Sequence, residues 1–567
     1  MRSLKKILPL RFAACLLPLG VWAQSSTIEV DYRQPAKPLN VFWNSTGFSP
    51  ADAVAAPEMK QVLRDIGQLP ERGLKYIRPH YLLNLAVAEG MATGKPTYDW
   101  SRLDRVLDEI TNNRLKLIFE LMGLPSDGTD KRESRYDKNF QAQLERRKSY
   151  FDNLRNRDQI QNWKVFVTAL AEHLESRYGK EEVRTWLFET TNEPDGQHWW
   201  EYDIPTFLNY YDACSEGLKT ADLALQWGGP CTQSRPTIAD IFDALLDHCD
   251  TGINYFTGET GVRIDFISFH VKDLPQNMIN RELRIFDRIK ARHPKFARTP
   301  LINDESDPIR AWATPFWWQE GPWYAAFVVQ SIDLHQRLVI DGAGANYRLF
   351  SSDHAFMGDW NQRTTHTLFR DQPNPDGFIL IKKPVLTVME MVAKLGRQYV
   401  YVEIPKGISP YFGIIPSKDG DALSLLVYNK TAIEIGPDPR MTPGAEQKPG
   451  ADMSLPPKPV PDVEVALMAQ QQVKAQLKIR GISGTTATLQ EFLIDETHGN
   501  PHHEWVAMGK PTVLSSAQLA QLKVAEKPAL VRSQQIECPK GEYLYPLTVS
   551  SPSVSLIIIV PEKTSKP

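Results

Sequence analysis

Cysteine is scarce in this chain. Five cysteines occur in 567 residues, and only four follow residue 23, at dispersed positions. This spacing excludes a disulfide-dense scaffold and the paired cysteine motifs of structural zinc sites. One disulfide remains compatible with the sequence, which does not identify its pair. We expect hydrophobic cores to stabilise the fold, and we expect neither a metal nor a cofactor.

An excess of basic charge is also absent. The formal net charge is -3 at pH 7, and lysine and arginine are scattered along the chain. Nucleic-acid binding requires a basic surface, so nucleic acid is not an expected partner. The sequence also lacks a glycine-rich phosphate loop and a nucleophile-elbow serine. Kinase, dehydrogenase and lipase chemistry are therefore not supported.

Long apolar runs are missing beyond the N-terminus, where no stretch approaches the ~20 residues that a membrane helix needs. Residues 1–23 are typical of a signal peptide, with four basic residues, an apolar stretch over residues 12–21 and Ala23 before Gln24. We expect export to the periplasm or the medium and no membrane partner. The sequence does not indicate the oligomeric state.

The chain is too long for one core of ordinary size, so we expect more than one domain. Between residues 39 and 398, short apolar segments alternate with longer amphipathic ones, which is typical of repeated βα units. Eight such units predict a closed (β/α)8 TIM barrel. The eight predicted strands are residues 40–43, 75–78, 117–120, 185–188, 224–227, 266–269, 301–304 and 347–350.

Beyond the barrel, short alternating segments predict a β-sandwich domain over residues 399–567. A proline-rich stretch over residues 436–462 interrupts it and is interpreted as a long exposed loop. Residues 24–38 contain a strand-like segment, which we expect to join the sandwich. The predicted fold class is therefore an α/β TIM barrel followed by a β-sandwich.

Most predicted barrel strands run into a polar residue at the C-terminal end: His80, Glu193, His270, Glu305 and Asp353. In a TIM barrel these ends share one face, and active sites are built there. The five residues therefore predict one functional site.

The sharpest motif is Asn192-Glu193-Pro194 at the end of the fourth strand. Glycoside cleavage needs a protonated carboxylic acid beside the leaving oxygen, and an adjacent amide can bind the sugar's 2-hydroxyl. Asn192 and Glu193 supply these groups. The alternative is an ordinary turn, since all three residue types are common at element boundaries.

A second motif, Asn303-Asp304-Glu305, ends the seventh strand. Across a barrel mouth, two glutamates can approach to the ~5 Å that a retaining glycosidase requires, with one as nucleophile and one as acid/base. The alternative reading, an acidic loop in solvent, suits Asp307 better than Glu305, which directly follows an apolar run.

With these motifs, the sequence resembles glycoside hydrolase family 39, and its α-L-iduronidase branch more than its β-xylosidases. The resemblance covers roughly residues 27 to 563, and we expect no counterpart of the fibronectin-like domain that follows in the animal enzymes. The segments that carry it are residues 78–83, 119–123, 188–195, 210–218, 228–230, 254–262, 267–270, 294–297, 303–305 and 383–387.

The resemblance implies a role for each matching residue. Glu193 would be the acid/base, Glu305 the nucleophile, and Asn192 and His80 would contact the sugar. His80 has a second reading as a hydrogen-bonded core histidine. No metal or cofactor is implied.

The resemblance further implies that Lys272 pairs with a uronate carboxylate and that Asp353 and Arg363 make polar sugar contacts, since an Arg fork suits a carboxylate. The alternatives are a solvated loop for Lys272 and a surface salt bridge for Arg363. Trp312 is a further expected substrate contact. It follows Ala311, where the family has glycine, and this departure bears on how tightly a uronate binds.

The expected function is hydrolysis of terminal uronic-acid glycosides, α-L-iduronides in particular, by double displacement. The partner would be an oligosaccharide or a glycosaminoglycan-like chain, and a basic segment over residues 126–154 is a candidate contact for acidic neighbours. A β-xylosidase of the same family is one alternative. A non-catalytic carbohydrate-binding protein is the other.

Overall fold

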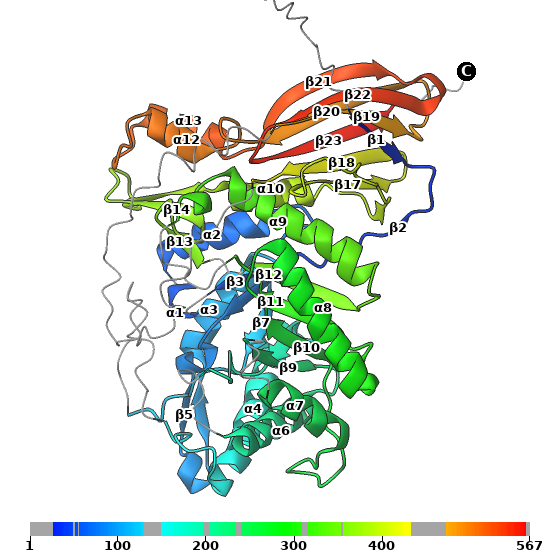
Figure 1. The fold of residues 1–567 in the computed structure, drawn as a ribbon. Coiled ribbons are helices and arrows are strands. Elements are labelled where there is room, and N and C mark those ends of the chain that lie inside the picture. The colour runs from blue at the N-terminus through cyan, green and yellow to red at the C-terminus, as the bar shows by residue number, and fades with distance from the viewer. Residues whose placement is uncertain are drawn as a thin grey trace, which may run out of the picture.

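The structure is a computed structural model, which describes residues 26–48, 51–54, 56–129, 149–196, 203–233, 240–308, 316–352, 355–431 and 472–562. A barrel surrounded by helices occupies one end of the molecule, and twisted β-sheets pack at the other end (Figure 1). The proline-rich segment, the signal-peptide segment and most of the basic segment over residues 126–154 lie outside the described residues.

The barrel is closed, and its strands run parallel throughout. This confirms the predicted fold class. The eight strands are β3 (Ser45–Phe48), β4 (Tyr76–Pro79), β7 (Lys116–Glu120), β8 (Leu187–Glu189), β9 (Gln226–Thr232), β10 (Phe266–His270), β11 (Leu301–Glu305) and β12 (Tyr347–Ser352).

The prediction of the first strand was wrong. Residues 40–43 are not a strand. Phe42 and Trp43 are each only 1% exposed because they pack against one another and Phe42 packs against Tyr347 of β12. The true first strand begins at Ser45. The Ser45 and Thr46 hydroxyls donate hydrogen bonds to strand β12, so this strand has little apolar pattern to reveal it.

Helices cover the barrel with their apolar faces turned inward. In α4, for example, Asn156 accepts hydrogen bonds from two backbone N–H groups at the start, and Gly179 ends the helix with a positive φ of 87°. The main helices are α2 (Pro57–Gly67), α3 (Ser101–Asn112), α4 (Arg157–Tyr178), α6 (Ile204–Ala221), α7 (Asp240–Thr251), α8 (Pro275–Arg292), α9 (Pro322–Leu334) and α10 (Pro384–Val392).

The second body consists of a three-stranded sheet packed on a seven-stranded sheet, with a separate apolar core that includes Ile28, Leu425, Leu477 and Ile557. The smaller sheet has the order β1 (Ser26–Asp31), β19 (Val473–Arg480), β22 (Glu542–Val549). The larger sheet has the order β2 (Lys37–Pro38), β16 (Gln398–Tyr399), β17 (Phe412–Asp419), β18 (Ala422–Asn429), β23 (Ser553–Pro561), β20 (Thr486–Ile494), β21 (Ala529–Glu537).

Strand β1 lies beside β19 in parallel register, and Glu29 pairs with Arg480 at 2.6 Å. The barrel contacts the sandwich through α9, where Trp323 Nε1 donates to the carbonyl of Thr431 at 3.1 Å. The Tyr428 hydroxyl donates to Asp333 at 2.8 Å. The two bodies therefore share buried polar contacts.

A small third sheet, together with two helices that the sequence did not predict, packs beside the barrel. The sheet contains β13 (Ala355–Gly358), β14 (Thr364–Arg370) and β15 (Phe378–Lys382), and the helices α12 (Pro501–Ala507) and α13 (Ser516–Ala525) lie between β20 and β21 in sequence. Trp360, Phe369 and Leu522 share one apolar cluster there. This packing supports the loop that carries Arg363.

Among the described helices, none has the length and apolar character needed to cross a membrane. The four described cysteines are all buried and unpaired with one another. No disulfide therefore forms within this part of the chain.

Candidate active site

A buried arginine organises the C-terminal end of the barrel. Arg78, in strand β4, is fully buried, and its guanidinium points into a group of acceptors contributed by several other strands. Nη1 lies 3.0 Å from Glu305 Oε1, and Nη2 lies 3.0 Å from Asn192 Oδ1. The other close contacts of the guanidinium are with Glu189 Oε2 (3.0 Å), Asp304 Oδ2 (3.0 Å), Glu120 Oε1 (2.5 Å) and Cys231 Sγ (2.7 Å).

Two of these carboxyl groups, those of Glu189 and Asp304, carry different charges. Burial raises the pKa of Asp304 well above its usual range, the charge of Glu189 adds to this, and Arg78 opposes it only in part. Burial also tends to raise the pKa of Glu189, but Arg78 and the hydrogen bond from Asp304 outweigh burial and lower it. Asp304 is therefore the protonated partner that donates to an ionised Glu189.

Glu193 and Glu305 face one another across His270. The His270 Nδ1 atom lies 2.9 Å from Glu193 Oε1 and 3.4 Å from Glu305 Oε2. One oxygen of each glutamate and a ring nitrogen of His270 all lie within 4.8 Å of one another. Glycosidases that retain configuration hold their carboxyl groups about 5–5.5 Å apart, whereas inverting enzymes need about 6.5–9.5 Å. The observed approach fits the retaining geometry.

The backbone conformation of Glu193 directs its side chain toward the region between Glu193 and Glu305. Glu193 has a positive φ of 44°, a conformation that non-glycine residues seldom adopt, and its N–H donates to the carbonyl of Cys231 at 3.0 Å. Such a backbone conformation persists where the surroundings enforce it, often at functional sites. The Glu193 side chain is 18% exposed, against 5% for Glu305. Glu193 is thus the more accessible of the two carboxyl groups.

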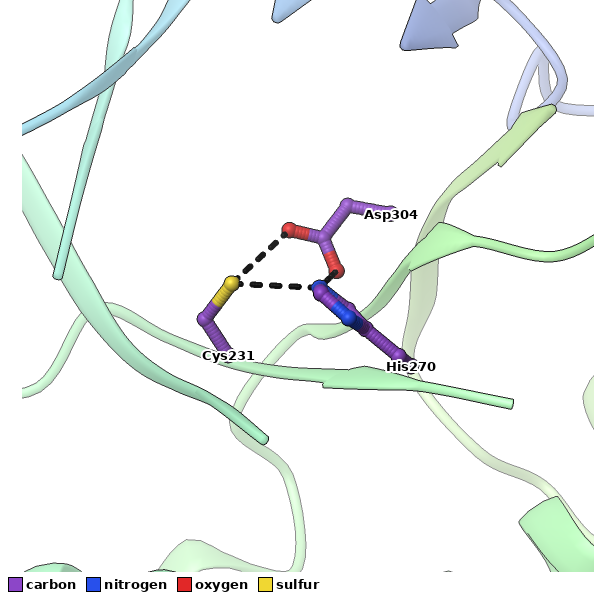
Figure 2. A group of neighbouring side chains, drawn as sticks. All are labelled: Cys231, His270 and Asp304. Carbon is purple, nitrogen blue, oxygen red and sulfur yellow. Dashed lines mark hydrogen bonds and ion pairs between the residues drawn. The ribbon is translucent and has the colours of Figure 1, made fainter. Parts of the chain in front are cut away.

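His270 is held on both sides. Figure 2 shows its ring beside Cys231 and Asp304, with Nε2 3.2 Å from the Cys231 sulfur and 3.4 Å from Asp304 Oδ1. Burial alone would lower the pKa of His270, but the charge of Glu305 and the hydrogen bond to Glu193 raise it to about 9. At neutral pH the ring is therefore an imidazolium that bridges the two glutamates.

Glu305 is ionised by its neighbours. Lys272 Nζ lies 2.6 Å from Glu305 Oε2, and His80 Nε2 lies 3.7 Å from Oε1. Burial tends to raise the pKa of Glu305, but the charges of His270, Lys272 and Arg78 outweigh it and hold the pKa well below the usual range. A carboxylate that stays ionised at every physiological pH suits a nucleophile.

The structure brings His80, Asn192 and Lys272 into the same cluster. His80 is 7% exposed, and its Nδ1 lies 2.6 Å from Glu120 Oε2, so it is a hydrogen-bonded buried histidine that also borders Glu305. Asn192 is 4% exposed and accepts from Arg78. The solvated-loop alternative for Lys272 was wrong, since its side chain is only 10% exposed and is paired with Glu305.

Arg363 lies at the edge of this region and is fully buried, so its alternative reading as a surface salt bridge was wrong. Its Nη1 lies 3.4 Å from Asp307 Oδ2, two residues after Glu305. Asp307 is also buried and accepts a hydrogen bond from the Tyr324 hydroxyl, which contradicts the solvated-loop reading of Asp307. Trp312 and Asp353 lie outside the described residues.

Three groups of side chains in this cluster have the spacing of metal ligands: Cys231, His270 and Asp304; Glu120, Glu189 and Cys231; and Glu193, His270 and Glu305. The Arg78 guanidinium lies within 3.0 Å of a member of each group. A cation in any of them would be repelled by this buried charge. The donor set is therefore better suited to the arginine than to a metal ion.

The sequence interpretation assigned no role to Arg78, Glu120, Glu189, Cys231 or Asp304. One available signal was the presence of charged residues inside otherwise apolar barrel strands, because charges are rarely buried unless they are paired. Glu120, Glu189 and Asp304 each carry that signal, and Arg78 is the buried cation that they imply.

A (β/α)8 barrel with two facing glutamates at the C-terminal ends of its strands defines a glycosidase. The model of glycosyl hydrolases family 39 matches residues 26–449 and 460–538. The chain belongs to this family and is a hydrolase of glycosidic bonds.

Among relatives, the α-L-iduronidase of Mus musculus is 31% identical over 543 residues, covering 91% of this chain and 78% of that protein. The human α-L-iduronidase is 31% identical over 521 residues, covering 88% and 73%. The β-xylosidase of Caldicellulosiruptor saccharolyticus is 22% identical over 510 residues, covering 87% and 90%.

Among solved structures, a bacterial orthologue of human α-L-iduronidase superposes with a TM-score of 0.78 at 33% identity, covering 95% of this chain and 84% of that chain. A monomeric β-xylosidase from Caulobacter crescentus has a TM-score of 0.67 at 18% identity, covering 95% and 100%. The second comparison shows a shared fold only.

Proposed function

We propose that this protein is a retaining glycoside hydrolase in which Glu305 is the nucleophile and Glu193 the acid/base. The observation that carries this proposal is the approach of the two carboxyl groups to within 4.8 Å on either side of His270. Their environments differ. Glu305 is buried among cations that keep it ionised, whereas Glu193 is more exposed and has His270 as its hydrogen-bond partner.

In the first step, a Glu305 oxygen attacks the anomeric carbon while the bond from that carbon to the leaving oxygen breaks. Glu193 transfers its proton to the leaving oxygen, which departs as an alcohol. The product is a glycosyl ester of Glu305, and Glu193 is left as a carboxylate.

In the second step, Glu193 removes a proton from water, and the resulting hydroxyl attacks the anomeric carbon. The ester bond to Glu305 breaks, so Glu305 is again a carboxylate and Glu193 is again protonated. Two inversions at one carbon give net retention. Arg78 fixes the Asn192 amide oxygen, which turns the amide nitrogen toward a substrate hydroxyl, and His80 borders the same space.

We propose terminal uronic-acid glycosides as substrates, with α-L-iduronides of oligosaccharides or glycosaminoglycan-like chains as the specific case. Lys272 supports this, because it places an ammonium group at the nucleophile, beside the sugar. Arg363 is a second buried cation near the strand end, and we retain Trp312 and Asp353 as proposed sugar contacts. The relatives named α-L-iduronidase agree with this assignment. Residues 1–23 further suggest an exported protein.

The test of the catalytic residues is to trap the glycosyl-enzyme with a 5-fluoro uronosyl fluoride and to locate the label by mass spectrometry. The label is expected on Glu305. The Glu305→Ala variant should lose on the order of 10⁴-fold in kcat. Glu181→Gln is a matched control, because the Glu181 side chain is 89% exposed. A label on another residue would refute the assignment.

Azide provides an independent test of Glu193. In Glu193→Ala, azide should restore turnover of a substrate with a good leaving group, because a small anion can attack the glycosyl ester without base assistance. A non-catalytic carbohydrate-binding protein would show no activity to restore.

A β-xylosidase activity is the second candidate, since a β-xylosidase also matches most of the chain. Assays with an aryl α-L-iduronide and an aryl β-D-xyloside distinguish the two. A preference for the xyloside would contradict the uronide proposal and leave the two-glutamate mechanism intact.

A further inference from the structure

Two hydrogen bonds that run in opposite directions join the turn carrying Glu193 to the end of strand β9. The N–H of Glu193 donates to the carbonyl of Cys231 at 3.0 Å. Two residues further along each segment, the N–H of Gln233 donates to both carboxylate oxygens of Asp195, at 3.1 and 3.0 Å. The first bond joins two backbone groups. The second depends on the side chain of Asp195.

Both of the joined segments have an unusual backbone. Glu193 has a φ of 44° and Cys231 a φ of 58°, and non-glycine residues seldom adopt positive φ. Such conformations persist only where surrounding contacts enforce them. The Glu193 side chain is 18% exposed and is hydrogen-bonded to His270. The position of its carboxyl group therefore depends on how firmly the turn is held.

Asp195 is suited to hold this turn. It is 7% exposed, and the N–H of Gly196, the next residue, donates to the carbonyl of Glu193 at 2.8 Å. Burial raises the pKa of Asp195 to about 6, the N–H of Gln233 opposes this rise, and the charge of Glu193 adds to it. At neutral pH Asp195 is thus mainly ionised. A hydrogen bond to an ionised carboxylate is stronger than one to a neutral acceptor.

We propose that Asp195 is a positioning residue for the acid/base: by accepting the hydrogen bond from Gln233, it holds the turn in which the Glu193 carboxyl faces the leaving oxygen. This inference rests on the proposed role of Glu193 and deepens it. Asp195 exchanges no proton with the substrate and acts through the backbone of Glu193. Without this bond Glu193 is present but misplaced, and a displacement of about 1 Å can cost on the order of 10²-fold in rate.

Misplacement of the acid has a characteristic kinetic effect. A phenol leaves slowly unless it receives a proton, whereas 2,4-dinitrophenolate leaves without one. The first step should therefore be slowed for phenyl glycosides and spared for dinitrophenyl glycosides. In the second step Glu193 is the base that activates water, so the glycosyl-enzyme should accumulate when the first step is fast.

The experiment compares kcat and KM of the wild type, Glu193→Ala, Asp195→Ala, Asp195→Asn and Asp287→Ala. The substrates are phenyl and 2,4-dinitrophenyl glycosides, each prepared with α-L-iduronic acid and with β-D-xylose. Asparagine keeps an oxygen that can accept from Gln233. Asp287, on helix α8, is a matched control because its side chain is 72% exposed.

The expected result for Asp195→Ala depends on the leaving group. The value of kcat/KM on the phenyl glycoside should fall on the order of 10²-fold. On the dinitrophenyl glycoside kcat/KM should stay close to the wild-type value, while kcat and KM fall together because the glycosyl-enzyme accumulates. Azide should restore that kcat. Asp195→Asn should recover most of the phenyl glycoside rate, and Asp287→Ala should match the wild type on every substrate.

Two outcomes would overturn the proposal. Equal losses on both leaving groups, with KM unchanged, would show only a loss of active protein. An Asp195→Asn variant as impaired as Asp195→Ala would show that the hydrogen bond from Gln233 is not the cause. If the melting temperature showed that Asp195→Ala did not fold, Asp195→Glu would serve instead. Its longer side chain displaces the carboxylate, so the selective loss on the phenyl glycoside would be required of it.

The Glu193→Ala variant separates this inference from the proposed function. If Glu193→Ala loses the phenyl glycoside selectively and Asp195→Ala does not, Glu193 remains the acid/base and Asp195 does not position it. If Glu193→Ala shows no dependence on the leaving group, the acid/base assignment fails, and this inference fails with it. Because both sugars are tested, the comparison does not depend on the uronide assignment.

Discussion

Replacing His270 with glutamine should remove a pH-dependent part of the stability. Burial tends to lower the pKa of this ring, but Glu305 and Glu193 raise it from 6.5 to about 9. Because the folded pKa lies above the unfolded one, the protonated ring stabilises the fold. This contribution is complete below about pH 6.5 and is lost as the pH rises through about 9. The difference between the two pKa values corresponds to about 3 kcal/mol.

The measurement is urea unfolding of the wild type and His270→Gln across a series of pH values from about 6 to about 10. Glutamine keeps hydrogen-bonding capacity and cannot take the charge. The free energy of unfolding of the wild type should exceed that of the variant most at the acid end, and the two curves should converge by about 3 kcal/mol toward the alkaline end. Other buried groups, such as Lys383, are common to both proteins and cancel. Parallel curves would refute the reasoning.

Three further outcomes follow from the structure. Arg78→Lys keeps the charge but not the planar fork, so it should lower the free energy of unfolding by about 3–5 kcal/mol, and a loss below 1 kcal/mol in urea titrations would contradict the central role of the guanidinium. Lys383 is fully buried and donates to the carbonyls of Trp360 (2.7 Å) and Gln362 (2.6 Å), next to Arg363. Lys383→Met should therefore lower the free energy of unfolding by about 1–3 kcal/mol for each carbonyl left without its donor. It should also raise KM for the iduronide, with little change for the xyloside. A thiol reagent should leave the four described cysteines unmodified in the folded protein and react with all four in urea, and rapid reaction without urea would contradict their burial.

The repeated pattern of the barrel could be predicted from the sequence because its interior strands are apolar runs. Seven of the eight predicted strands overlap strands of the closed barrel. The exception is the predicted first strand, at residues 40–43. Phe42 and Trp43 are buried there by side-chain packing, although neither residue belongs to a strand of the sheet. Strand β3 begins with Ser45 and Thr46, whose hydrogen bonds to β12 become visible only once the barrel closes.

The two glutamates could be predicted because each ends an apolar strand and because the carboxyl ends of barrel strands meet on one face. The cluster of buried charged residues around them could not be predicted. Glu120, Glu189 and Asp304 are distant in sequence, and only the three-dimensional arrangement shows that one arginine contacts all three. The pairing of Lys272 with Glu305 was equally inaccessible, because a lysine in a loop has no distinctive local pattern.

Strand β1 has a consequence for the order in which the chain folds. Glu29 and Arg480, which pair across the β1 and β19 strands, are 451 positions apart. Strand β1 must therefore wait for its partner until most of the polypeptide has been made, while the barrel between the two strands can close earlier. Contacts of such long range form slowly, because loop closure precedes any gain in energy. Until β19 is made, β1 therefore lacks its partner strand. The completed sandwich then joins the segments that precede and follow the barrel in the chain.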